Sequence, residues 1–382
     1  MKKEIVEAAQ DAIVEFYPDY KFPKVEEPIS DWIRDFMKRN DMENKESHML
    51  EKARSEGANI TTIRDWFNNV YSEDEFKKYK PVMIGNIDET MLVSKSKLLC
   101  VVKRGSRYAI CQEDDDTEHV TMLACVTTDG QSVPPYLIFP LKYLPTTLDN
   151  QIKNNQVFIG CQPQGWINQD TFHEYAKVLV TFVENHRKRY GFHATEPFLL
   201  FGDSHNSREN PETLKLLKDN NITFMTYPSH CTHVLQPLDI GIFGPFKKFF
   251  KIEKRKISKE KITFVGDQPC HRSRQRVVTV LACLEALHMC CSVRKIEKAF
   301  QYAGLFPRDP EQTLKNPRVN QDESIINISR KRKRISIDGK IIINNSLIKE
   351  LELQEQDSKG HRRKLTKYVI IFIFCIANFH SI

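Results

Sequence analysis

The hydrophobic pattern along the chain predicts strands alternating with helices. Apolar residues at helical spacing predict a helix over 171–189, a second around 214–217 and a third after Pro237. Short apolar runs rich in β-branched residues predict buried strands. These runs span residues 82–88, 119–128, 133–140, 197–202 and 222–227. The predicted order is β-β-β-α-β-α-β-α, and the connections are short enough for one compact α/β domain.

Three aspartates occur where these elements end or begin. Asp88 closes the first predicted strand, so we expect it at a strand tip, and Asp203 directly follows the strand at 197–202. Asp239 lies near the start of the helix after Pro237. Three carboxylates brought together from distant positions can hold a pair of divalent ions, which is the core of a phosphodiester-cutting site. A single Asp among 50 acidic residues is more often a cap, a turn residue or a solvated charge than a metal ligand. The motifs around each Asp must therefore decide between these roles.

The three acids lie in motifs that resemble a known family. The chain has N-x-D-E-T at Asp88, D-x-H-x-S at Asp203 and Q-P-L-D-x-G-x-F-G-P-x-K at Asp239, in that order. Together these motifs resemble the DDE-type transposases of the pogo and Tigger branch, which are Tc1/mariner-like and related to centromere protein B and jerky. Further segments that resemble the family are residues 119–141, 165–167, 227–233 and 298–307. The resemblance runs from about residue 30 to about residue 310.

This resemblance implies both a fold and a chemistry. The fold would be α/β, an RNase H-like core with a mixed sheet flanked by helices, the acids at one sheet edge, and a small helical amino-terminal helix-turn-helix remnant. The reaction would be two-metal cleavage of DNA followed by strand transfer. Asp88, Asp203 and Asp239 would be the catalytic residues and the ligands of two Mg²⁺ or Mn²⁺ ions. Double-stranded DNA and a homodimer on that DNA are the implied partners, with no small-molecule cofactor.

Four neighbours of the acids are expected to support them. Asn86 and Glu89 would support the first acid, and His205 would orient the second acid or its water. Asn206, which follows His205, is assigned to the same supporting group.

The segment that follows Asp203 departs from the family pattern at two positions. Ser204 stands where glycine is common, and Arg208 stands where histidine is common. Ser204 lacks the freedom of glycine at positive φ, so we expect an altered loop geometry. Arg208 is expected to contact phosphate.

The amino end is shorter than in relatives with a full DNA-binding region. Only residues 1–87 precede Asp88, too few for two helix-turn-helix units, and residues 30–40 resemble the last helix of the second unit. A catalytically inactive, transposon-derived DNA-binding or chromatin protein is therefore the alternative function. A zinc or interaction protein unrelated to DNA is a third hypothesis, which the linked motifs disfavour. The predicted domains are a helical remnant (1–75), a catalytic domain (80–265), a helical closing segment (266–312) and a basic, poorly ordered tail (313–382).

Basic residues are concentrated in two places, although the net charge of +7 is modest. The first group follows the third acid and is predicted to attract a phosphate backbone, with an ordinary solvated helix face as the alternative. It comprises Lys247, Lys248, Lys251, Lys254, Arg255 and Lys256. The second group predicts a nuclear import signal, and hence a nuclear protein, with nonspecific nucleic-acid contact as the alternative. It comprises Arg330, Lys331, Arg332, Lys333 and Arg334.

The remaining features narrow the function classes. Ten cysteines without an apolar leader after Met1 predict free thiols in a reducing compartment. Residues 230–233 and 288–291 lack two clean arms of zinc ligands, so structural zinc is disfavoured. The apolar stretch 368–377 is too short to span a membrane, which favours an interfacial segment or a translated fragment of neighbouring sequence. Kinase, dehydrogenase and α/β-hydrolase motifs are not found.

Overall fold

The sheet and its helices belong to one compact unit of the chain. The computed structural model describes residues 38–39, 56–92, 118–146, 148–149, 156–259, 270–321, 337–342 and 347–353. The chain divides into two units, residues 1–50 and residues 51–382. Every strand and every long helix described lies in the second unit.

The core is a six-stranded sheet with the strand order β4-β3-β2-β1-β5-β6. Its strands are β1 (Ile84–Leu92), β2 (Val120–Thr127), β3 (Ser132–Phe139), β4 (Phe158–Cys161), β5 (Phe198–Gly202) and β6 (Ile222–Thr226). β2 is antiparallel to β1 and β3, whereas the pairs β1–β5, β3–β4 and β5–β6 are parallel. All strands except β2 therefore end at the same edge of the sheet, so residues that follow them gather there.

The hairpin between β2 and β3 turns at the dipeptide Asp129-Gly130. Gly130 has φ of +81°, a conformation that glycine adopts without steric cost. Thr127 Oγ1 donates a 2.5 Å hydrogen bond to Asp129 Oδ1, and Thr127 N donates to the Gln131 carbonyl at 2.9 Å. The strands predicted at 119–128 and 133–140 are confirmed as β2 and β3.

Two details of the predicted strands are wrong. β1 begins after a 3-10 helix, η1 (Pro81–Met83), and continues to Leu92, so Asp88 lies in the middle of the strand and not at its tip. The polar residues after Ile87 end the apolar run, but their backbone still pairs with β2. β4 is not predicted because it is a four-residue edge strand with only one buried residue, and it carries little hydrophobic signal.

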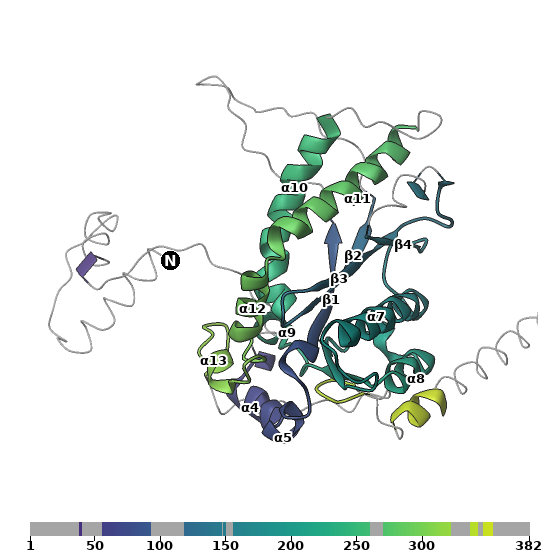
Figure 1. Ribbon diagram of the computed structural model, residues 1–382. Helices are drawn as coiled ribbons and strands as arrows, with labels where there is room; N and C mark the ends of the chain where they lie inside the picture. Colours follow the sequence, from purple (N-terminus) through teal and green to yellow (C-terminus); the bar gives the residue numbers. More distant parts are fainter. Residues whose placement is uncertain are drawn as a thin grey trace, which may run out of the picture. The chain divides into compact units, whose positions relative to one another are not determined.

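Helices cover both faces of the sheet, as Figure 1 shows. α7 (Gln169–Arg189) and α8 (Pro211–Asp219) pack on one face, which we call the α7 face. α10 (Phe243–Lys259), α11 (His271–Cys290) and α12 (Val293–Tyr302) pack on the other, which we call the α10 face. The shorter elements are α5 (Glu73–Phe76), η2 (Asn206–Glu209), α9 (Thr232–Leu235), η3 (Leu238–Ile242) and α13 (Pro310–Leu314). The predicted α/β class with a mixed sheet flanked by helices is confirmed.

Helix α4 (Ile60–Asn69) packs against the α10 face of the sheet. The indole of Trp66 lies 5.9 Å from the Tyr227 ring, and its Nε1 donates to the Thr226 carbonyl at 3.0 Å. Tyr71 Oη donates to the Leu305 carbonyl at 2.9 Å. The segment before β1 is thereby joined to the segment after α12.

Residues 337–342 lie along the outer edge of β6. Thr226 N donates to the Lys340 carbonyl at 2.8 Å, and Ile342 N donates to the Phe224 carbonyl at 2.9 Å. Ser204 Oγ hydrogen-bonds Asp338 Oδ1 beside the second acid. The segment thus satisfies backbone groups that an uncovered edge strand would leave open.

Candidate metal centre

Strand β1 sends neighbouring acids to opposite faces of the sheet. Asp88 is paired with Ala124, which belongs to the core on the α10 face, whereas Glu89 is paired with Leu123 on the α7 face. Side chains alternate along a strand, so Asp88 projects toward α10 and Glu89 toward α7. Asp88 is buried, with 6% of its surface exposed.

The second acid is placed beside Asp88 by the parallel pairing of β1 and β5. Asn86 is opposite Phe201, so two further residues along each chain bring Asp88 next to Asp203. A carboxylate oxygen from each of Asp88, Glu89 and Asp203 lies within 4.8 Å of the others. Asp203 Oδ1 is buried and makes no hydrogen bond within the described part of the chain. This is a cluster of hard oxygen donors.

The third acid, Asp239, lies on η3, a π-helical turn that runs into α10. Its charge is near enough to raise the pKa of Asp88, but it is not part of the close cluster of Asp88, Glu89 and Asp203. Asn86 joins this turn to the sheet, because its Oδ1 accepts a 3.0 Å hydrogen bond from Leu238 N. Its Nδ2 donates to the Phe201 carbonyl at 3.1 Å and to Tyr227 Oη at 3.2 Å. The sequence predicts Asn86 as a support for Asp88, whereas the structure shows it holding the turn that carries Asp239. Asp239 itself is exposed, so the cluster opens to solvent on this side.

The electrostatics of Asp88 reflect this crowding. Burial raises its pKa well above the usual range, and the negative charges of Asp239, Glu89 and Asp203 raise the pKa further. A divalent cation would remove that repulsion. Carboxylate oxygens are the ligands that Mg²⁺ and Mn²⁺ prefer. Asp203 Oδ1 is a buried oxygen of this kind that makes no hydrogen bond among the described residues, although Arg208 Nη2 lies 3.3 Å from it. The residues present fit such an ion.

Gln236 is a site residue that sequence reasoning does not single out. It is 1% exposed, and a hydrogen bond from its side chain to Asp88 opposes the upward shift of that pKa. Its Oε1 has no hydrogen-bond partner among the described residues. Its place as the first residue of the Q-P-L-D motif, three before Asp239, is the available signal.

Glu89 and Arg208 form an ion pair on the α7 face. Arg208 is fully buried, and its Nη2 hydrogen-bonds Glu89 Oε2. The same nitrogen lies 3.3 Å from Asp203 Oδ1. The prediction that Arg208 contacts phosphate is wrong, because the side chain is enclosed by protein. Glu89 meets Asp88 through its backbone, since Glu89 N donates to Asp88 Oδ1 at 2.8 Å.

His205 and Asn206 shape the loop after the second acid. His205 Nδ1 hydrogen-bonds Ser207 Oγ at 2.9 Å and lies 3.8 Å from Glu89 Oε1. The Asn206 carbonyl accepts a 3.4 Å hydrogen bond from Gln169 Nε2 at the start of α7. Both residues are exposed.

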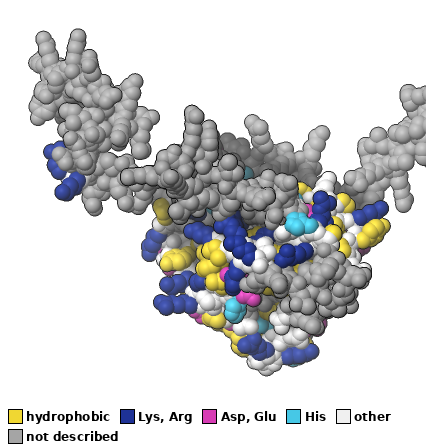
Figure 2. All heavy atoms as spheres, turned by 90° about the horizontal axis from the view of Figure 1, so that it is seen from above, with side chains coloured by type: hydrophobic (Ala, Val, Ile, Leu, Met, Phe, Trp, Pro, Cys, Tyr) yellow, Lys and Arg dark blue, Asp and Glu magenta, His cyan; other side chains and the backbone are white. Residues whose placement is uncertain are grey.

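The basic residues after the third acid lie on α10, whose apolar stripe is buried in the core. Lys247, Lys248, Arg255 and Lys256 are exposed, whereas Lys251 and Lys254 are half-buried. Figure 2 shows Lys and Arg side chains across the described part of one face, around a small acidic group. Because η3 continues directly into α10, the basic helix begins within one turn of the third acid.

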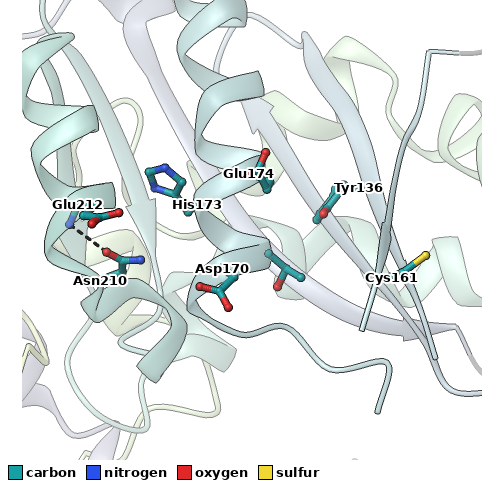
Figure 3. Close-up of a pocket in the computed structure, with 8 residues that line it drawn as sticks. Tyr136, Cys161, Asp170, His173, Glu174, Asn210 and Glu212 are labelled. Carbon is teal, nitrogen blue, oxygen red and sulfur yellow. Dashed lines mark hydrogen bonds between the residues drawn. The ribbon is translucent and has the colours of Figure 1, made fainter. Parts of the chain in front are cut away.

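A separate cavity of about 290 Å³ lies where α7 and α8 begin (Figure 3). It is lined by Tyr136, Cys161, Asp170, Thr171, His173, Glu174, Asn210 and Glu212. His173 Nδ1 is hydrogen-bonded to Thr213 Oγ1 at 2.9 Å, and Asn210 caps α8.

Among the described residues, only the cluster at Asp88 brings together three groups that could hold a metal ion.

Several predicted features fall outside the described residues: the basic run 330–334, the apolar stretch 368–377 and most of residues 30–40, of which 38–39 are helical and exposed. The cysteines that the structure describes are all free thiols, as predicted. Within the described residues no single helix is both long and apolar enough to cross a membrane, although α11 and α12 meet the length and composition requirement when joined across their 72° bend.

Comparisons with known proteins bear on this site. Residues 116–300 match the family model of the DDE superfamily endonucleases. The chain is 25% identical over 286 residues to the MFS-type transporter clz9 of Cochliobolus lunatus, covering 70% of this chain and 28% of that protein. It is 21% identical over 216 residues to the pogo transposable element with KRAB domain of Mus musculus, covering 56% of this chain and 34% of that protein. The chain thus spans about a third or less of the length of these two curated relatives.

Among solved structures, the Mos1 mariner paired end complex with Mn is similar with a TM-score of 0.45 at 12% identity, covering 81% of this chain and 76% of that chain. The catalytic domain of Mos1 mariner transposase gives a TM-score of 0.38 at 11% identity, with 71% and 95% covered. The matched region contains Asp203 and Asp239. Asp88 precedes this region, and the pairing of β1 with β5 brings it next to Asp203. Residues 116–300 of this chain are thus similar to the DDE superfamily endonucleases, and the acidic cluster lies partly within this region.

Proposed function

We propose that the chain is a metal-dependent DNA endonuclease and strand transferase of a transposable element. The observation that supports this most is the cluster of carboxylates from β1 and the end of β5, together with the charge of Asp239 on η3, which is near enough to raise the pKa of Asp88. Metal-assisted phosphodiester cleavage uses such a set of oxygen ligands. In this proposal water attacks a phosphodiester at a transposon end, and the freed 3′ hydroxyl then attacks target DNA.

Asp88, Asp203 and Asp239 would hold two Mg²⁺ or Mn²⁺ ions. When bound, such ions would activate the attacking oxygen and stabilise the leaving oxygen. Asp88 would give up its proton on binding, because its pKa is raised by burial and by neighbouring acids. The hydrogen bonds from Gln236 and from Glu89 N hold its carboxylate in one orientation. Asn86 keeps the turn that carries Asp239 against the sheet.

The substrate would be double-stranded DNA, with α10 as a phosphate-contacting element. Its exposed Lys247, Lys248, Arg255 and Lys256 are close in sequence to the third acid, so a bound backbone would be led toward the cluster. Two copies of the chain on DNA would bring two transposon ends together. A nuclear location follows from this substrate.

The experiment is divalent-ion-dependent nicking of supercoiled DNA by the purified full-length protein. Asp203→Asn keeps the shape of the side chain while it removes a ligand charge, so nicking in Mn²⁺ should be lost. Asp170→Asn changes an exposed acid in the first turn of α7 and should nick like the unaltered protein. Nicking that survives in Asp203→Asn would refute the assignment of this acid.

The alternative is a catalytically inactive DNA-binding or chromatin protein. The observation that favours it is the ion pair of Arg208, which places a fixed cation beside two of the acids. Salt-sensitive DNA binding without any nicking by the unaltered protein, in either Mg²⁺ or Mn²⁺, would favour this alternative.

A further inference from the structure

Arg208 contacts the acidic cluster but has no role in the proposed cleavage reaction. Its guanidinium is 0% exposed and stacks over the Phe172 ring at 4.3 Å. Its Nη1 donates to Ser207 Oγ at 2.7 Å, and its Nη2 contacts the carboxylates of Glu89 and Asp203. A charge buried this completely is stable only when it is paired, because the loss of hydration is large.

The pairing with Arg208 opposes the coordination of a metal ion by Glu89. Glu89 lies close enough to Asp88 and Asp203 to be a third ligand of one ion. Its Oε2, however, already accepts a charge-assisted hydrogen bond from Arg208. A divalent ion that recruited Glu89 would leave the guanidinium buried with one partner fewer, which opposes coordination by Glu89.

Arg208 also changes the charge of the cluster. Asp88, Glu89, Asp203 and Asp239 carry four negative charges when all are ionised, and Arg208 balances one of them. Because the guanidinium is fixed by the Phe172 ring and by Ser207, it acts as a permanent counter-ion at the centre.

We propose that Arg208 is a positioning residue that withholds Glu89 from the metal-ligand set and stabilises the cluster before metal binds. The ligand set is then limited to Asp88, Asp203 and Asp239. This inference rests on the proposed metal-dependent function, but it concerns metal binding and metal-free stability and not cleavage.

The test is a double-mutant cycle on the full-length protein with the variants Arg208→Met, Glu89→Gln and both together. Mn²⁺ binding is measured from the electron paramagnetic resonance signal of free Mn²⁺, and thermal unfolding is measured in EDTA and in Mn²⁺. We expect Arg208→Met to bind Mn²⁺ about tenfold more tightly, because a nearby cation is removed and Glu89 is released. The same variant should unfold at a lower temperature in EDTA and recover in Mn²⁺.

Adding Glu89→Gln to Arg208→Met should cancel both effects. The neutral pair no longer has an uncompensated buried charge, and the amide is a poor ligand. Unchanged Mn²⁺ affinity in Arg208→Met, with equal destabilisation in EDTA and in Mn²⁺, would overturn the proposal and leave Arg208 a packing residue.

Glu89→Gln alone keeps the proposal testable if Arg208→Met does not fold. If Glu89 is withheld, this change should weaken Mn²⁺ binding far less than Asp203→Asn does. Equal weakening in the two variants would contradict the proposal. If the unaltered protein binds no Mn²⁺, the proposed function fails. Arg208→Met then decides separately, because a gain of Mn²⁺ binding supports the inference and no gain overturns it.

Discussion

The two faces of β1 place adjacent acids in opposite electrostatic settings. Asp88 projects to the α10 face among other carboxylates, and its pKa is raised. Glu89 projects to the α7 face and is paired with the buried guanidinium of Arg208. One residue along a strand therefore separates an acid whose charge is unfavourable without metal from an acid whose charge is already balanced. A carboxylate on one face would thus serve metal binding, whereas a carboxylate on the other face balances a buried charge.

The largest expected effect is the loss of cleavage in Asp88→Asn. Removing this ligand charge should lower the nicking rate by about a thousandfold or more, because ligand and metal contribute several kcal/mol to the transition state. The same change should raise the unfolding temperature in EDTA, since it removes a buried charge that neighbouring acids repel. Plasmid nicking and thermal unfolding check the two effects. A lower unfolding temperature of Asp88→Asn in EDTA would show that repulsion from the neighbouring acids does not destabilise the metal-free protein.

Glu89→Ala should have the opposite effect on stability. It leaves Arg208 buried beside Asp203 alone, which should cost about 3 kcal/mol of unfolding free energy. Urea unfolding in EDTA measures this cost. Glu174→Ala, which removes an exposed acid paired with Lys177 on α7, is the matched control and should change stability by about 0.5 kcal/mol or less. Equal effects in the two variants would remove the contrast between the faces.

Asn86→Ala tests how the third acid is attached to the sheet. The change breaks hydrogen bonds to Leu238 N, the Phe201 carbonyl and Tyr227 Oη, so it should cost about 2 kcal/mol. Cleavage should become dependent on higher Mn²⁺ concentration, because the turn that carries Asp239 is loosened. The nicking rate is measured against Mn²⁺ concentration. Weaker metal binding would lower the rate only at low Mn²⁺ concentration, whereas general destabilisation would lower it at all concentrations alike.

The pH dependence of metal-free stability should show the raised pKa of Asp88. Its folded pKa lies above the unfolded value of about 3.9, so the folded state binds more protons between these values. The contribution of Asp88 to the unfolding free energy should therefore fall as the pH rises from about 4 through the folded pKa, and then level off. Urea unfolding in EDTA over this range measures the slope, which should be smaller in Asp88→Asn. An identical slope in both proteins would argue against a shifted Asp88.

The smallest expected effect concerns the basic side of α10. Lys247→Gln with Lys248→Gln should weaken DNA binding and reduce the salt dependence of log K by about 2, since two phosphate contacts are lost. Lys177→Gln on α7 is the control and should leave the salt dependence unchanged. Fluorescence anisotropy at several salt concentrations would detect the difference, and the same slope in both variants would exclude this part of α10 from the DNA contact.

Most of the fold is predictable from the local pattern, and the two wrong predictions have physical reasons. The strands before Asp203 and Tyr227 and the helix α7 are long apolar runs whose period or composition distinguishes them. β4 is too short to stand out, and β1 continues past its apolar run because β2 pairs with the polar residues. Such pairing is a tertiary contact, so the amino-acid pattern of one segment does not contain it.

The sequence by itself determined which three aspartates are the candidate site residues and which kind of element, a strand or a helix, lies at each one. It could do so because local apolar patterns and motif spacing are short-range properties. The tertiary structure alone decided which acid is balanced and which is not. The link from Asn86 to Leu238 and the pair between Glu89 and Arg208 join residues 152 and 119 positions apart. The physical reason is that the charge and hydrogen bonding of a buried side chain depend on the neighbours that folding brings to it, and those neighbours come from distant parts of the chain.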